Sequence, residues 1–228
     1  MTHLSLKLAA TACVLVAATA CSSSSSPDGD DAAAISSCGH PVTVESPPER
    51  VVVQPHNLAE VLAALDLADR IVGYSAFGPF TPAEEYAEEL ADIPQLGNGP
   101  LSREVVADQE PDLLYSQIDY GDTMVDDYGP LNIPVLFTTM YCPEHAPAGD
   151  DGEPSMLESR YRDMEDLGRL FDVQDKAAEV VDDLRDRMTA VRSATNNQDP
   201  VRVAAVGFLS GTDGPLSANG GTTLTSEL

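Results

Sequence analysis

Short apolar runs alternate along the chain with segments in which apolar residues recur at helical spacing. Apolar runs without internal polar positions are typical of strands that are buried on both faces of a sheet. We therefore expect strands at residues 50–54, 70–74, 112–116 and 133–137. Helical patterns separate these runs, and strands joined by helices over short connections form a parallel sheet covered on both faces. The predicted fold class is α/β.

Three of the expected helices begin at residues that commonly cap helices. Asn57 and Ser155 are each followed by a glutamate three residues later, which is the spacing of a capping box. Ser102 precedes a third helical pattern, and a short acidic helix is expected near residues 83–91. The caps therefore support the alternation that the apolar pattern predicts.

Two helices follow the fourth strand with no strand between them. The second runs from about Gln174 to Thr195, and a valine-rich strand pattern at residues 201–206 comes after it. This order predicts an α/β lobe, one long helix and the beginning of a second α/β lobe. We place these parts at residues 38–172, 173–197 and 198–228.

The first 20 residues have the pattern of a secretory signal peptide. Lys7 precedes 13 residues without charge, a run too short to span a bilayer. Small residues precede Cys21, and this junction resembles the lipobox of bacterial lipoproteins, in which the cysteine is acylated. Residues 21–37 then read as a flexible, acylated tether on the outer face of the cell membrane. Secretion without acylation is the alternative.

Charge limits the classes of partner. The chain has 38 acidic residues against 12 lysines and arginines, which gives a formal net charge of −26. A surface of this charge repels nucleic-acid phosphates, so we exclude nucleic-acid binding. Because 43% of the residues are hydrophobic, a core is still expected beneath the acidic surface.

Two cysteines remain once the leader and Cys21 are set aside. Outside the cytoplasm Cys38 and Cys142 are expected to form a disulfide. Metal ligation is the alternative, because His40 and His145 lie close to them in sequence. No short spacing of metal ligands supports that alternative.

Four segments occur in a recognisable order, namely PPERVVVQPHNLAEVLAALDLADRIVGYS, LSREVVADQEPDLLYS, LNIPVLF and SMLESRYRDMEDLGRLFDVQDKAAEVVDDLRDRM. In this order they resemble class III substrate-binding proteins of ABC importers, which capture iron–siderophore complexes, cobalamin or haem. The resemblance implies a monomer with two α/β lobes, a ligand in the cleft between them and delivery to a membrane permease. It also implies neither enzymatic activity nor an intrinsic cofactor. Because the family continues through a whole second lobe, we expect the sequence to be truncated.

Ligands of parallel α/β sheets meet the loops at the carboxyl ends of the strands. Aromatic and hydrogen-bonding side chains in these loops suit a large, partly apolar chelate. The candidate ligand-binding residues are Gln54, His56, Asn57, Tyr74, Phe77, Phe80, Ser116, Gln117, Tyr120, Thr139 and Tyr141. For any one of them, packing or helix capping is the alternative role.

The same loops contain no lysine or arginine. Anionic tri-catecholate chelates usually need a basic pocket, so a neutral or cationic ligand such as a ferric hydroxamate is favoured. Cobalamin is the second choice, and haem, with Tyr74 or His56 as axial ligand, is a variant. A lipoprotein that chelates bare metal ions is the remaining alternative.

Glu104 lies in the first turn of the helix that Ser102 caps. A carboxylate is favoured there by the helix dipole alone. The resemblance implies a second role, in which a glutamate at this position docks the lobe onto arginines of the permease. Neither GYSAFG nor GFLSGTDG has the spacing of a nucleophile elbow or a nucleotide-binding loop.

Overall fold

The computed structural model describes residues 33–117, 119, 123–149, 152–196, 206–209 and 216–218. The predicted signal peptide, the predicted lipidation site Cys21 and the candidate ligand residue Tyr120 lie outside the described residues. Within the described part of the chain, no helix combines the length and the apolar character needed to cross a bilayer.

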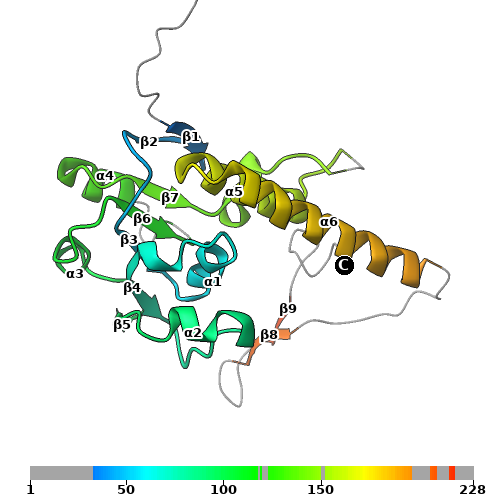
Figure 1. The fold of residues 1–228 in the computed structure, drawn as a ribbon, viewed down its shortest axis with the longest axis horizontal. Coiled ribbons are helices and arrows are strands. Elements are labelled where there is room, and N and C mark those ends of the chain that lie inside the picture. Colours follow the sequence, from blue (N-terminus) through cyan, green and yellow to red (C-terminus); the bar gives the residue numbers. More distant parts are fainter. Residues whose placement is uncertain are drawn as a thin grey trace, which may run out of the picture. The chain divides into compact units, whose positions relative to one another are not determined.

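A five-stranded parallel sheet forms the centre of the lobe, in the order β5-β4-β3-β6-β7 (Figure 1). Its strands are β3 (Val51–Gln54), β4 (Ile71–Ala76), β5 (Gln95–Asn98), β6 (Leu113–Ser116) and β7 (Val135–Phe137). All four strands expected from the apolar runs are confirmed. The edge strand β5 was missed, because its residues are half-buried or exposed and include a glycine, so they form no apolar run.

Helices connect the strands and continue beyond them. They are α1 (Asn57–Ala63), α2 (Ala87–Leu90), α3 (Arg103–Ala107), α4 (Met124–Tyr128), α5 (Met156–Leu170) and α6 (Gln174–Thr195). Short 3-10 turns are η1 (Ala68–Arg70), η2 (Glu84–Tyr86), η3 (Gly129–Leu131), η4 (Thr139–Tyr141) and η5 (Pro143–His145). The α/β fold class and the bounds of the long helix α6 are confirmed. A further antiparallel pair, β8 (Val206–Leu209) with β9 (Leu216–Ala218), overlaps the strand expected at residues 201–206 by its first residue.

The predicted caps have mixed outcomes. The Ser102 and Ser155 hydroxyls accept hydrogen bonds from the N–H groups of Val105 and Glu158, as capping residues do. The prediction for Asn57 was wrong, because His56 occupies the cap position and makes no side-chain cap bond. The Glu60 carboxylate instead accepts a hydrogen bond of 2.7 Å from the Ala83 N–H and so fastens the loop after β4.

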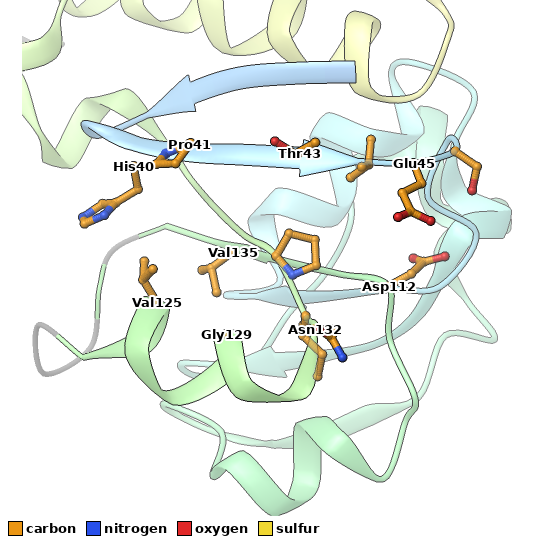
Figure 2. Close-up of a pocket in the computed structure, with 13 residues that line it drawn as sticks. His40, Pro41, Thr43, Glu45, Asp112, Val125, Gly129, Asn132 and Val135 are labelled. Atoms are coloured by element: carbon orange, nitrogen blue, oxygen red, sulfur yellow. The ribbon is translucent and has the colours of Figure 1, made fainter. Parts of the chain in front are cut away.

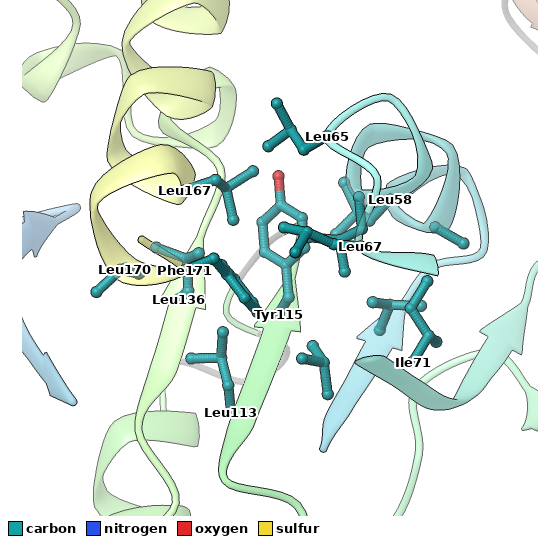
Figure 3. Close-up of a cluster of buried hydrophobic side chains, with 14 of the residues drawn as sticks. Leu58, Leu65, Leu67, Ile71, Leu113, Tyr115, Leu136, Leu167, Leu170 and Phe171 are labelled. Carbon is teal, nitrogen blue, oxygen red and sulfur yellow. The ribbon is translucent and has the colours of Figure 1, made fainter. Parts of the chain in front are cut away.

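Side chains of the central strand enter two hydrophobic cores. Val51 and Val53 face the core formed with α1, α5 and α6, whereas Val52 faces the core formed with α3 and α4. Figure 3 shows Tyr115 of β6 in the first core, between Leu58 of α1 and Leu167 of α5. The sheet is therefore buried on both faces, which explains why its central strands read as continuous apolar runs.

The segment before β3 corrects the expected tether. Residues 33–37 form β1 (Ala33–Ser37), which pairs with the antiparallel strand β2 (His40–Val44). Ile35 and Ser37 are buried and alternate with exposed neighbours, a period of two that the composition of this segment concealed. The two-residue turn between the strands consists of Cys38 and Gly39, both at positive φ, as a tight hairpin requires.

A disulfide joins Cys38 of the hairpin turn to Cys142, which follows η4. The expected pairing is therefore present, and these cysteines cannot act as thiolate metal ligands. The bond spans 104 residues of sequence and attaches the hairpin to the loop beyond β7.

We predict that Cys38→Ser/Cys142→Ser lowers the free energy of unfolding. Closing so long a loop stabilises a fold by about 4–5 kcal/mol in the chain-entropy model. Urea unfolding followed by circular dichroism measures the loss. Reduction of the wild-type protein serves as the control and is expected to lower its stability to that of the variant. Equal urea midpoints for the oxidised wild type and the variant would contradict the prediction.

Candidate ligand-binding site

Three aromatic rings gather where β3 and β4 end. The Phe80 ring centroid lies 4.4 Å from that of His56 and 5.7 Å from that of Tyr74. Burial lowers the pKa of His56, while the Glu60 carboxylate acts in the opposite direction. His56 therefore presents a neutral imidazole to Phe80 at neutral pH. The adjacency of β3 and β4 brings together three side chains that the sequence analysis had selected from two loops.

A second group forms where β6 and β7 end. The Gln117 Nε2 donates a hydrogen bond of 2.9 Å to the Tyr141 hydroxyl, and the Thr138 Oγ1 donates one of 3.0 Å to the Gln117 carbonyl. Gln117 and Tyr141 line a pocket of about 490 Å³, together with Asp119, Phe137 and the disulfide. The two predicted site residues thus share one cavity.

The two groups lie at the same edge of the sheet. Strands β3 and β6 pair in parallel, and the Gln117 N–H donates a hydrogen bond of 2.8 Å to the Gln54 carbonyl where both strands end. We call this edge the rim. It comprises the His56, Tyr74 and Phe80 rings, exposed Phe77, and the Gln117–Tyr141 pair.

Three candidate residues lie beneath the rim rather than on it. Gln54 is 1% exposed; its Oε1 accepts from the Leu101 N–H and its Nε2 donates to the Ser116 hydroxyl. Ser116 is fully buried. Thr139 is also buried, and both its N–H and its hydroxyl bind Asp163. These three side chains are buried and support the loops from below.

Two further candidates are exposed on helices. Asn57 lies in the first turn of α1, and Glu104 lies in the first turn of α3. Hydrogen bonds from its own backbone N–H and from the Ser102 hydroxyl lower the pKa of Glu104. Glu104 is therefore a solvent-facing carboxylate that is ionised at neutral pH.

Another cavity, of about 720 Å³, adjoins the rim pocket, because His40 and Val125 line both (Figure 2). It is formed between β2 and the chain from α4 to β7, with His40, Glu45, Asp112 and Asn132 among its lining residues. Asp112 and Asn132 precede strands β6 and β7, so much of this cavity lies toward the amino ends of the strands. No local pattern in the sequence indicates this cavity, because its walls come from β2 and from the chain between α4 and β7, which are far apart in sequence.

Acidic side chains dominate the charge of the rim pocket. Asp119, Asp126 and Glu144 line it, and its lining residues include neither lysine nor arginine. Asp119 also accepts hydrogen bonds from the N–H groups of Thr123 and Met124, and so caps α4. Among the described residues, no group of three or more His, Cys, Asp or Glu side chains could hold a metal ion.

The carboxyl-edge rim and the two helices that follow β7 are features of a ligand-binding α/β lobe. A family model described as "Periplasmic binding protein" matches residues 51–226, which is most of the chain. The chain therefore belongs to the periplasmic binding protein family. Members of this family are binding proteins, in agreement with the expectation that the chain is not an enzyme. Comparison with curated protein sequences gives no match.

Solved structures agree with this assignment. An ABC-type Fe3+-hydroxamate transport protein from Saccharomonospora viridis is 31% identical over 72% of this chain and 56% of its own, with a TM-score of 0.60. The petrobactin-binding protein YclQ from Bacillus subtilis and the catecholate-siderophore binding protein VctP from Vibrio cholerae share the fold. Each is 18% identical, with a TM-score of 0.62 over 84% of this chain and 62% of its own. The chain thus spans between 56% and 62% of the length of these three structures.

Asp163 is a site residue that the sequence analysis missed. It lies on α5, and the Thr139 N–H donates to both of its carboxylate oxygens at 3.1 Å, while the Thr139 hydroxyl donates at 2.6 Å. Burial raises the pKa of Asp163 to about 6, although these hydrogen bonds and Arg160 act in the opposite direction. Asp166 raises it further, and buried Tyr115 also lies within electrostatic range.

We predict that Asp163 makes the wild-type protein gain stability as pH falls from 7 to 4. The pKa of Asp163 in the folded state, about 6, lies above the ordinary value of 3.8, so the folded state takes up the proton first. The Asp163→Asn variant lacks this titrating carboxyl group. The free energy of unfolding of the wild type, compared with that of the variant at the same pH, should therefore rise as the pH falls from 7 to 4. Urea unfolding of both proteins at several pH values measures the difference. A difference that stays constant with pH would contradict the prediction.

Proposed function

We propose that this protein is the extracytoplasmic substrate-binding component of an ABC importer and that it captures a ferric chelate, most favourably a hydroxamate siderophore. The observation that carries the proposal is the composition of the rim in a member of the periplasmic binding protein family. Aromatic rings and hydrogen-bonding groups are present at one edge of the sheet, and the rim pocket is lined by acids without lysine or arginine.

The charge of the rim selects among chelates. A tri-catecholate ferric complex is strongly anionic and would meet the carboxylates of Asp119, Asp126 and Glu144 without a cationic partner from the pocket lining. A ferric trihydroxamate core is neutral, and its apolar surface can pack against the rings of Phe80 and Tyr141. The Saccharomonospora viridis relative, which is described as a Fe3+-hydroxamate transport protein, supports this choice.

The other parts of the proposal follow from the family pattern. We place a lipid anchor on Cys21, which holds the protein on the outer face of the membrane as a monomer. The ligand is enclosed between the described lobe and a second lobe reached through α6. Glu104, exposed and ionised on α3, docks the lobe onto the permease.

Cobalamin or haem captured by the same rim is the second candidate. His56 supports the haem variant, because burial lowers the pKa of its imidazole and a neutral imidazole can serve as an axial ligand of haem iron. A lipoprotein that chelates bare metal ions has less support, since the cysteines are joined and the described residues offer no metal cluster.

We predict that the full-length protein binds a ferric trihydroxamate with a dissociation constant below about 1 μM. The measurement is a titration with ferric hydroxamates, ferric catecholates, cobalamin, haem and free ferric iron, followed by quenching of tyrosine fluorescence, because the chain has no tryptophan. Free iron should be inert. Binding of bare iron or zinc alone would overturn the proposal, and tightest binding of haem or cobalamin would favour the second candidate.

Variants locate the binding on the rim. Tyr141→Ala and Phe80→Ala should each weaken chelate binding by about tenfold, as expected for the loss of a stacked ring. Leu131→Ala is the matched control for Tyr141→Ala, because Leu131 is likewise an exposed large apolar residue but lies on η3, away from the rim. Equal affinities for all three variants and the wild type would place the ligand elsewhere.

A further inference from the structure

The η4 turn contains Tyr141, the more exposed residue of the Gln117–Tyr141 pair. Tyr141 is 52% exposed to solvent. A single 3-10 turn of three residues has few internal hydrogen bonds and cannot hold its own geometry. The position of the Tyr141 ring therefore depends on what the turn is attached to.

The turn is attached at both of its ends and at its first residue. On its amino side, the Thr138 Oγ1 donates to the Gln117 carbonyl. On its carboxyl side, Cys142 is joined to Cys38 of the β1–β2 hairpin. At the first residue of the turn, the Thr139 N–H donates to both carboxylate oxygens of Asp163 of α5, and the Thr139 hydroxyl donates to one of them.

The attachment to Asp163 differs from those to Gln117 and Cys38, because it requires the burial of a carboxylate, which costs free energy. Asp163 is 9% exposed, and burial of a carboxylate is unfavourable unless hydrogen bonds and a cation compensate. The Thr139 donors and the Arg160 guanidinium, 3.7 Å away, offset part of that cost. Arg160 also reaches the Met140 sulfur at 3.0 Å, so two residues of η4 are bound by two charged residues of α5.

The other side of α5 is fixed as well. Arg185 of α6 forms a two-point contact with Glu158, at 2.9 and 3.1 Å, and its guanidinium lies 4.3 Å from the Tyr161 ring centroid. Asp163 thus holds the η4 turn against a helix that is itself fastened to α6. A turn held in this way has little freedom to move its exposed ring.

We propose that Asp163 is a positioning residue for ligand capture: through Thr139 it fixes the η4 turn and holds the Tyr141 ring at the rim. The inference rests on the proposed function, because it names a residue that acts through a ligand-contacting side chain. Asp163 itself touches no ligand.

The test uses the full-length protein and ferrioxamine B, a ferric trihydroxamate, as the probe. Thr139→Val removes the hydroxyl donor while it keeps the shape of the side chain, and Thr139→Ser keeps the donor. We expect Thr139→Val and Asp163→Asn to weaken binding by about tenfold and Thr139→Ser to bind as the wild type does. Equal binding by Thr139→Val and Thr139→Ser would overturn the proposal.

A double-mutant cycle separates positioning from general stability. If Asp163 acts through Tyr141, Asp163→Asn should have no further effect on binding in a Tyr141→Ala background. Effects that multiply would show that Asp163 acts independently of Tyr141 and would overturn the proposal. If Asp163→Asn does not fold, the same cycle is run with Thr139→Val and decides in the same way.

Hydrogen exchange keeps the inference distinguishable from the proposed function. In the ligand-free protein, the Tyr141 and Cys142 amides donate to the Thr138 and Thr139 carbonyls within the turn. Thr139→Val should speed exchange at these two amides relative to Thr139→Ser. Failure of the wild type to bind any chelate, with the difference in exchange present, would overturn the proposed function and leave only the fixing of the turn by Asp163. Chelate binding by the wild type with unchanged exchange would overturn the positioning role alone.

Discussion

The parallel pairing of β3 with β4 on one side and β6 on the other is the constraint on which the rest of the structure depends. Val51, Val52 and Val53 are fully buried, so the sheet requires a helical layer on each face. Parallel strands also end at one edge. Residues near positions 56, 80 and 117, which are far apart in sequence, therefore meet at one rim.

Polar contacts hold the loops of that rim in place. Gln54 joins the ends of β3 and β6 and accepts a hydrogen bond from the Leu101 N–H. Glu60 accepts a hydrogen bond from the loop after β4, and Asp163 accepts hydrogen bonds from Thr139 of η4. The contacts of Gln54 with Ser116 and of Asp163 with Thr139 satisfy groups that would otherwise be costly to bury. The loops of the rim are thus held in place by polar side chains, while the Phe77 and Tyr141 rings remain exposed and the Tyr74 and Phe80 rings pack partly against the first core.

The sequence predicted the parts of the fold that depend on local pattern. Buried strands show as apolar runs and α6 shows as a long helical period, so β3, β4, β6, β7 and α6 were found. The edge strand β5 and the β1–β2 hairpin lack such runs and were missed. At the site, sequence position at a strand end could not separate exposed Tyr141 from buried Gln54, because burial depends on partners distant in the chain. Asp163 looked like an ordinary solvent-facing acid of a helix for the same reason.

Paramagnetic broadening in NMR spectra tests the central claim most directly, because it reports where a ferric chelate sits. Ferrioxamine B is paramagnetic, and its gallium analogue is a diamagnetic control of the same shape. Our account predicts that the ferric complex broadens amide signals near His56, Phe80, Gln117 and Tyr141 and spares those near Glu45 and Asn132. Broadening centred on Glu45 and Asn132, or spread evenly over the chain, would contradict it.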